Sequence, residues 1–184
     1  MTNSIAIFCG SALGSDQIFS ETARQVGHTI AEQGKTLVYG GGRSGLMGIV
    51  ADSALEAGGQ VIGVIPHVLV DRELAHQGLT ELHVVKDMQE RKLKMSALSD
   101  GFIAMPGGAG TLEEIFEQWT WAQLGIHLKP NAFLNVNGFY DDLLKFLKMT
   151  TDKGFTHARF TDSLIVSDSV KAILKQMDQF QAPE

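Results

Sequence analysis

Cysteine and long hydrophobic runs are scarce in this chain. Its 184 residues contain a single cysteine, Cys9, so no intrachain disulfide can form, which fits a reducing cytoplasm. Residues 1–4 show neither the basic start nor the apolar stretch of a signal peptide, and no run is long enough to span a bilayer. These absences predict a cytoplasmic protein with no membrane partner.

Positive charge is also in short supply. Fifteen Lys and Arg residues face 21 Asp and Glu residues, a formal net charge of −6, which argues against a nucleic acid polymer as partner. A small phosphorylated ligand remains open, because backbone amides and a few local cations can bind it. The six histidines show no metal-ligand spacing, so we expect no metal site.

What the chain does contain is an alternation of short apolar strands and amphipathic helices. The strands are predicted at residues 4–9, 36–39, 61–65, 82–85, 101–105, 132–135 and 163–166. Helices are predicted at residues 18–33, 44–57, 88–98, from the turn after residue 105 to about 124, 140–152 and 170–180. Such alternation, with 44% hydrophobic residues and no linker, predicts a single α/β domain over residues 1–184. Its fold is expected to be Rossmann-like and doubly wound, with a mostly parallel sheet flanked by helices.

The turns after the strands should converge on one rim, where ligands bind in such folds. Residues 67–81 have poor periodicity and are expected to form a long, mostly irregular segment at this rim.

A glycine-rich motif, residues 106–114, follows one predicted strand and opens a helix. Glycines let the backbone approach a ligand closely, and free N–H groups at a helix start attract phosphate. Thr111 is interpreted as a helix cap or a phosphate donor, while Glu113 and Glu114 fall in the first helical turn, where carboxylates also suit the helix dipole. The motif matches neither a Walker A loop nor a dinucleotide fingerprint, and a simple tight turn is the alternative.

A second cluster, residues 40–48, has five glycines after another strand. We expect close approach of a ligand at Gly41 and Gly42. Gly45 and Gly48 lie within the helical stretch, where glycine carries a propensity cost, and are interpreted as packing positions.

The third segment is the predicted helix 88–98. Arg91 and Lys92 lie in its first turns, where basic residues oppose the helix dipole. A solvated charged face is the default interpretation, and the unfavourable placement leaves a functional role open. Leu93, Ser96 and Ala97 are expected to form the buried side of this helix.

Met88-x-x-Arg91-Lys92 followed by the 106–114 motif resembles the Lonely Guy (LOG) family of cytokinin riboside 5′-monophosphate phosphoribohydrolases, many of them once mislabelled lysine decarboxylases. The segments 4–11, 39–48, 63–66 and 121–125 also look like family segments, so the resemblance extends over nearly the whole chain. It implies an enzyme without cofactor, commonly a homodimer with the site near the subunit interface. Ala109 fills a variable position of the motif.

The resemblance implies hydrolysis of the N-glycosidic bond of an adenosine 5′-monophosphate, with or without an N6 substituent, to a free base and ribose 5-phosphate. Glu114 matches the catalytic glutamate and Arg91 the catalytic arginine. Further residues match or adjoin substrate-binding positions, with the phosphate on residues 108–111: Glu73, Lys92, Gly108, Ala109, Gly110, Thr111, Glu113 and Thr120. Glu73 is aligned by spacing alone. A non-catalytic nucleotide-binding or carrier protein is the alternative, and preference for the leaving base stays open.

Overall fold

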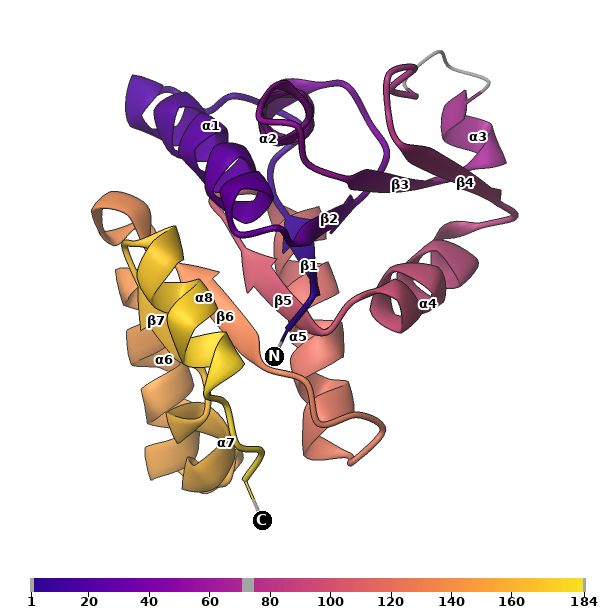
Figure 1. Ribbon diagram of the computed structural model, residues 1–184. Helices are drawn as coiled ribbons and strands as arrows, with labels where there is room; N and C mark the ends of the chain where they lie inside the picture. The colour runs from indigo at the N-terminus through magenta and orange to yellow at the C-terminus, as the bar shows by residue number, and fades with distance from the viewer. Residues whose placement is uncertain (1, 71–74, 184) are drawn as a thin grey trace.

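A central sheet of seven parallel strands organises the computed structural model, which describes residues 2–70 and 75–183. The strands are β1 (Ser4–Phe8), β2 (Thr36–Tyr39), β3 (Val61–Pro66), β4 (Glu81–Val85), β5 (Gly101–Ala104), β6 (Asn131–Leu134) and β7 (Ile165–Ser167). Their order is β4-β3-β2-β1-β5-β6-β7, and every strand pairing in it is parallel (Figure 1). The predicted α/β class and strand alternation are therefore confirmed.

Helices cover both faces of the sheet. They are α1 (Gln17–Glu32), α2 (Gly45–Glu56), α3 (His67–Val70), α4 (Met88–Leu98), α5 (Ala109–Gln123), α6 (Asp141–Asp152), α7 (Ala158–Asp162) and α8 (Val170–Asp178), with a short 3₁₀ turn, η1 (Val136–Gly138). One core layer packs α1, α2 and α8 against the sheet, and the other packs α4, α5 and α6 (Figure 1). Burial on both faces explains why the strands carry few polar residues.

Several short elements differ from the sequence prediction. The segment 67–81 begins with the single helical turn α3 and ends where β4 starts, and residues 71–74 lie outside the described residues. The η1 turn and α7 were not predicted, because a helix of three to five residues is too short to show a 3.6-residue period. The last strand lies at Ile165–Ser167 rather than at residues 163–166.

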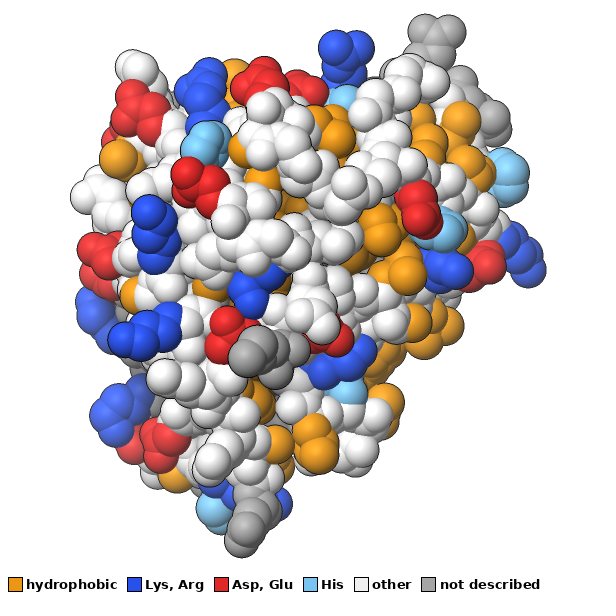
Figure 2. All heavy atoms as spheres, viewed as in Figure 1, with side chains coloured by type: hydrophobic (Ala, Val, Ile, Leu, Met, Phe, Trp, Pro, Cys, Tyr) orange, Lys and Arg blue, Asp and Glu red, His pale blue; other side chains and the backbone are white. Residues whose placement is uncertain are grey.

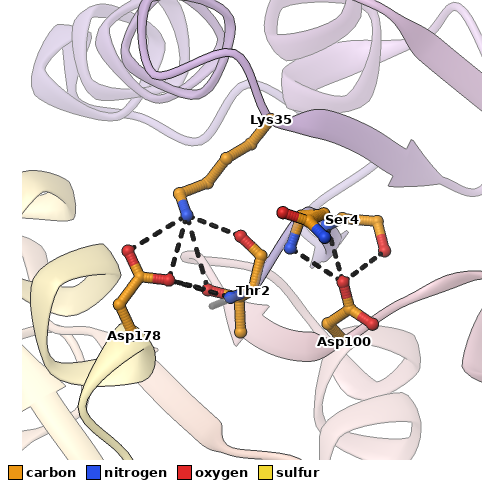
Figure 3. A network of polar contacts seen from close by, with 6 residues as sticks. Thr2, Ser4, Lys35, Asp100 and Asp178 are labelled. Carbon is orange, nitrogen blue, oxygen red and sulfur yellow. Dashed lines mark hydrogen bonds and ion pairs between the residues drawn. The ribbon is translucent and has the colours of Figure 1, made fainter.

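Polar contacts tie the N-terminal segment to two distant elements (Figure 3). The Lys35 ammonium lies 3.1 Å from both carboxylate oxygens of Asp178, and Thr2 donates its N–H and its hydroxyl to the same carboxylate. Asp100 likewise accepts from the N–H and hydroxyl of Ser4. The Thr2 hydroxyl is the largest influence on Asp178, and together with the Thr2 N–H and Lys35 it lowers the pKa of this carboxyl to about 2. The network fixes the start of β1 against α8 and the α1–β2 turn.

Among the described residues, no helix is both long enough and apolar enough to cross a membrane.

Candidate active site

The site lies where the winding of the sheet reverses, between the carboxyl ends of β1 and β5. The Gly10 N–H after β1 donates to the Pro106 carbonyl after β5 at 3.1 Å, so the two turns adjoin. Beside them is a cavity of about 330 Å³, which we call the reaction cavity. Its walls come from these turns, α2, α3, α4 and the start of α5. This is the position at which doubly wound folds bind ligands.

Arg91 and Glu114 meet in the wall of the reaction cavity. The Arg91 guanidinium lies 3.1 Å from the Glu114 carboxylate and also donates through Nε to the Val64 carbonyl at 3.1 Å. Both side chains are about nine-tenths buried. Burial raises the pKa of Glu114 above its ordinary value, although the charge of Arg91 opposes this. The two residues predicted to be catalytic are thus brought together, and Arg91 does not belong to a solvated charged face.

Gly40 makes room for this arginine. A Cβ added at Gly40 would overlap the Arg91 guanidinium. The sequence interpretation emphasised the next two glycines and missed this one. The only sequence signal was the position of Gly40 at the end of a strand, directly before two further glycines.

Gly41 and Gly42 lie away from the lining of the reaction cavity. Gly41 has a φ of +72°, and a Cβ there would lie 3.1 Å from the Ile65 side chain. Its carbonyl accepts from the His76 N–H at 2.9 Å, and Gly42 pairs with Ala75 in an isolated bridge. Both glycines therefore join β2 to the segment before β4, and ligand approach at them stays a prediction.

Packing explains the other two glycines of that cluster. A Cβ at Gly45 would collide with the Ser11 backbone, and one at Gly48 with the Arg43 backbone. The predicted packing roles are confirmed, because both close contacts involve main chain that cannot yield.

The 106–114 motif forms the turn from β5 into α5. Gly108 is the N-cap of α5, and the first intrahelical bond runs from the Leu112 N–H to the Gly108 carbonyl. The N–H groups of residues 109–111 therefore have no intrahelical acceptor, and these residues line the reaction cavity. Thr111 is 3% exposed, and its hydroxyl packs against Gly107, where a Cβ would collide with it. Thr111 is not the helix cap.

Lys92 joins α4 to α5. Its ammonium pairs with the Glu113 carboxylate and lies 3.0 Å from the Glu117 carboxylate. Partial burial opposes the charge of Lys92, but the two carboxylates outweigh it and raise the pKa of this side chain. Lys92 and Thr120 are not among the residues that line the reaction cavity, and the Thr120 hydroxyl donates to the Phe116 carbonyl.

The buried side of α4 differs from the prediction. It consists of Arg91, Met95 and Ser96, whereas Leu93 is 56% exposed and Ala97 is exposed as well. The prediction was correct for Ser96 and wrong for Leu93 and Ala97, because the helix turns its arginine rather than its leucine toward the sheet.

Other residues at or near the predicted site have mixed placements. Glu73 lies outside the described residues. Met47 and Met88 line the reaction cavity. Cys9 also lines it, but burial raises the pKa of its thiol, so it is no activated nucleophile. In the described part of the chain, no group of three or more His, Cys, Asp or Glu side chains is placed to hold a metal ion.

Comparison with known proteins adds three findings. A family model described as "Possible lysine decarboxylase" matches residues 47–177. The chain is 42% identical over 177 residues to the cytokinin riboside 5′-monophosphate phosphoribohydrolase LOG7 of Arabidopsis thaliana, covering 96% of this chain and 82% of that protein. It is also 43% identical to the probable cytokinin riboside 5′-monophosphate phosphoribohydrolase LOGL1 of Oryza sativa subsp. japonica, covering 96% of this chain and 79% of that one.

Solved structures share the fold at lower identity. The Moco carrier protein of Chlamydomonas reinhardtii superposes with a TM-score of 0.73 at 21% identity, covering 97% of this chain and 99% of that chain. The molybdenum cofactor binding protein of Rippkaea orientalis has a TM-score of 0.72 at 21% identity, with 97% of each chain covered. At such identity the likeness concerns the fold alone.

Proposed function

Because the chain belongs to the Lonely Guy family of cytokinin riboside 5′-monophosphate phosphoribohydrolases, we propose that it hydrolyses the N-glycosidic bond of adenosine 5′-monophosphates. The products are a free base, adenine or an N6-substituted cytokinin, and ribose 5-phosphate. The observation that carries the proposal is the buried Arg91–Glu114 pair, which faces a cavity floored by a glycine-rich helix start. The lone, buried, reduced Cys9 fits an enzyme that works in the cytoplasm.

The Glu114 carboxylate supplies the charge that the reaction needs. As the base leaves, positive charge builds on the ribose, and a nearby carboxylate stabilises it and orients the attacking water. The raised pKa of Glu114 also improves its capacity to accept a proton from that water near neutral pH. Arg91 donates to the Glu114 carboxylate, and a guanidinium is a poor proton donor, so its role is to hold Glu114 in place and orient the leaving base rather than to act as a general acid.

The start of α5 is the proposed phosphate site. The N–H groups of residues 109–111 and the positive end of the helix dipole suit a dianion. Glu113 stands beside this site as the partner of Lys92, which offsets its charge. The proposed phosphate site is therefore made of backbone N–H groups. Small residues at Gly108, Ala109 and Gly110 let the phosphate approach that backbone.

A lysine decarboxylase activity is disfavoured by the same geometry. Pyridoxal phosphate enzymes bind their cofactor through a lysine. None of the described residues that line the reaction cavity is a lysine, and the nearby Lys92 is occupied by Glu113 and Glu117.

Incubation of the purified protein with AMP and with isopentenyladenosine monophosphate tests the proposal. We expect release of base and ribose 5-phosphate, with the ratio of kcat/KM values identifying the preferred base.

Glu114→Gln should lower kcat by at least about 100-fold, because the positive charge of the transition state loses the carboxylate that stabilises it. Glu56→Gln, an exposed carboxylate at the end of α2, is the control and should leave turnover unchanged. Base release no greater than that of Glu114→Gln would overturn the proposal. Recovery of intact AMP from its complex would then favour the non-catalytic carrier.

We further propose that the protein is a homodimer that uses the face around α4 and the end of α5. Hydrophobic side chains gather over this side of the molecule (Figure 2). On β4, on α4 and just after α5, six apolar side chains are 42–69% exposed: Val84, Met88, Leu93, Leu124, Ile126 and Leu128. A surface of this kind is typical of a protein–protein interface. Trp119, on the same helix α5, is 6% exposed and donates to the Phe160 carbonyl of its own chain, so it is not available for this contact.

Sedimentation of a Leu93→Glu, Leu124→Glu variant tests the dimer. We expect the wild-type protein to sediment as a dimer and the variant as a monomer, because two buried carboxylates would lack partners in the interface. Phe155→Glu, which alters an apolar side chain that is 87% exposed on the α6–α7 turn, should remain dimeric. A monomeric wild type would contradict the proposal.

A further inference from the structure

A second cavity adjoins the reaction cavity across the β1 and β5 turns. Its volume is about 290 Å³, and it shares Gly10, Ser11 and Gly108 with the reaction cavity. It opens toward the other face of the sheet, where Leu46 and Phe19 pack with the α1 and α2 layer. The proposed phosphate site therefore stands between two hollows rather than at a closed end.

The lining of the second cavity is mostly apolar, and among the described residues that line it only Ser11 has a polar side chain. Its side chains include Leu13, Phe19, Leu46 and Phe139, and none of the described residues that line it carries a charge. The rings of Phe19 and Phe139 meet edge to face, with centroids 5.7 Å apart. Leu13 is 50% exposed and Phe139 43% exposed, so a ligand group placed here would cover apolar surface that now faces solvent. A β-phosphate would find no cation in this cavity, whereas an uncharged ring would be stabilised by burial and by aromatic packing.

We propose that the second cavity is a subsite for a group esterified to the 5′-phosphate, so that the enzyme accepts nucleoside 5′-phosphodiesters with an aromatic or other apolar substituent. The inference rests on the proposed function, which places the 5′-phosphate at residues 108–111. The sugar and base of such a ligand lie in the reaction cavity, and its ester group passes Gly10 and Gly108 into the second cavity. In the reaction, water adds its oxygen to C1′ and the base leaves with a proton. The phosphodiester stays intact on the ribose product.

Two matched ligands isolate the subsite: the methyl and phenyl esters of AMP. They carry the same charge and differ only in the group that would enter the second cavity. We expect the phenyl ester to bind about ten-fold more tightly, as burial of a ring predicts. Binding is measured by calorimetry with Glu114→Gln protein, in which the ligands persist, and hydrolysis of both esters is measured with the wild type.

Two variants locate the effect. Ala12 lines the second cavity but not the reaction cavity, so Ala12→Trp should fill the subsite and remove the preference for the phenyl ester while AMP affinity stays unchanged. Leu13→Ala, a milder change at an exposed side chain, should reduce that preference by about three-fold, since it removes part of the apolar wall. Equal binding of the two esters, or rejection of the phenyl ester by a protein that binds AMP, would overturn the subsite. The subsite is tested by ligand affinities, whereas the proposed function is tested by base release. A failure of base release would therefore overturn the proposed function, and a failure of the affinity tests would overturn the subsite.

Discussion

Gly40 and Arg91 show how a missing side chain can organise a site. The guanidinium occupies the space that a Cβ on Gly40 would fill, and from there it reaches Glu114 and the Val64 carbonyl. A glycine at the end of β2 is thus as necessary for the ion pair as the two charged residues. The residue immediately after it, Gly41, has a different reason to be glycine, its φ of +72°.

Gly40→Ala is therefore expected to lower the enzyme's activity while the protein still folds. The added methyl displaces the guanidinium from Glu114, and a shift of about 1 Å in a catalytic group lowers kcat/KM by about 100-fold. Kinetics with AMP and thermal unfolding measure the two effects. Gly34→Ala is the control: it has a φ of +66° and open space around its Cβ, so it should lower the melting temperature and leave kcat/KM intact. An active Gly40→Ala enzyme would show that Arg91 can work from another position.

Helices α4 and α5 carry the two halves of the ion pair, and Lys92 holds these helices together. The Lys92 ammonium lies between the carboxylates of Glu113 and Glu117, which are one turn apart on α5. Lys92 directly follows Arg91, which pairs with Glu114. This arrangement explains a feature that looked unfavourable in the sequence, two basic residues near the start of a helix. Their carboxylate partners come from α5, and Asp87 caps α4 independently by accepting from the Glu90 N–H.

Lys92→Met should weaken the contact between α4 and α5. Two carboxylates would lose their common partner, and we expect the free energy of unfolding to fall by about 2 kcal/mol, between the values typical of exposed and of buried pairs. Chemical denaturation measures the loss, and kcat should fall with it because Glu114 is less well positioned. Lys92→Arg keeps the charge and should recover most of both. A large rise in KM with unchanged kcat and stability would instead show that Lys92 binds the substrate directly.

At the scale of the whole molecule, polar contacts join the segment before β1 to α8, the last helix. Thr2, Lys35 and Asp178 link the start of β1, the α1–β2 turn and α8 (Figure 3). This network lies before β1, whereas the reaction cavity lies beyond the carboxyl ends of β1 and β5. The Asp178 pKa of about 2 lies below the value of about 3.9 for an unfolded chain. The unfolded state therefore binds the proton more readily, so this contribution to stability is complete above about pH 4 and disappears as the pH falls through 2.

Asp178→Asn tests that linkage. About a third of the carboxylate side chain is exposed, so solvent screening reduces the effect, and we expect the variant to be less stable by about 1 kcal/mol at pH 7. The difference from the wild type should narrow below pH 4 and vanish near pH 2, as followed by urea denaturation at each pH. Asp142→Asn, at a carboxylate that is 97% exposed, should show no such dependence. A difference that persists unchanged at pH 2 would show that packing, not ionisation, is responsible.

Sequence alone was sufficient to predict the alternation of strands and helices, the parallel sheet and the glycine-rich motif that opens α5. These features depend on side-chain periodicity and on glycine-rich turns, which are local properties of the chain. It also placed Arg91 and Glu114 among the candidate catalytic residues, through the resemblance of two motifs to a known family. Only the tertiary structure showed that Arg91 and Glu114, 23 positions apart in sequence, form a pair beside Gly40. It also showed that Lys92 has two partners on α5 and that a second cavity lies behind the proposed phosphate-binding turn. Such contacts arise where elements distant in sequence pack together, so their distances are set by the assembled sheet and its two helix layers rather than by any local pattern.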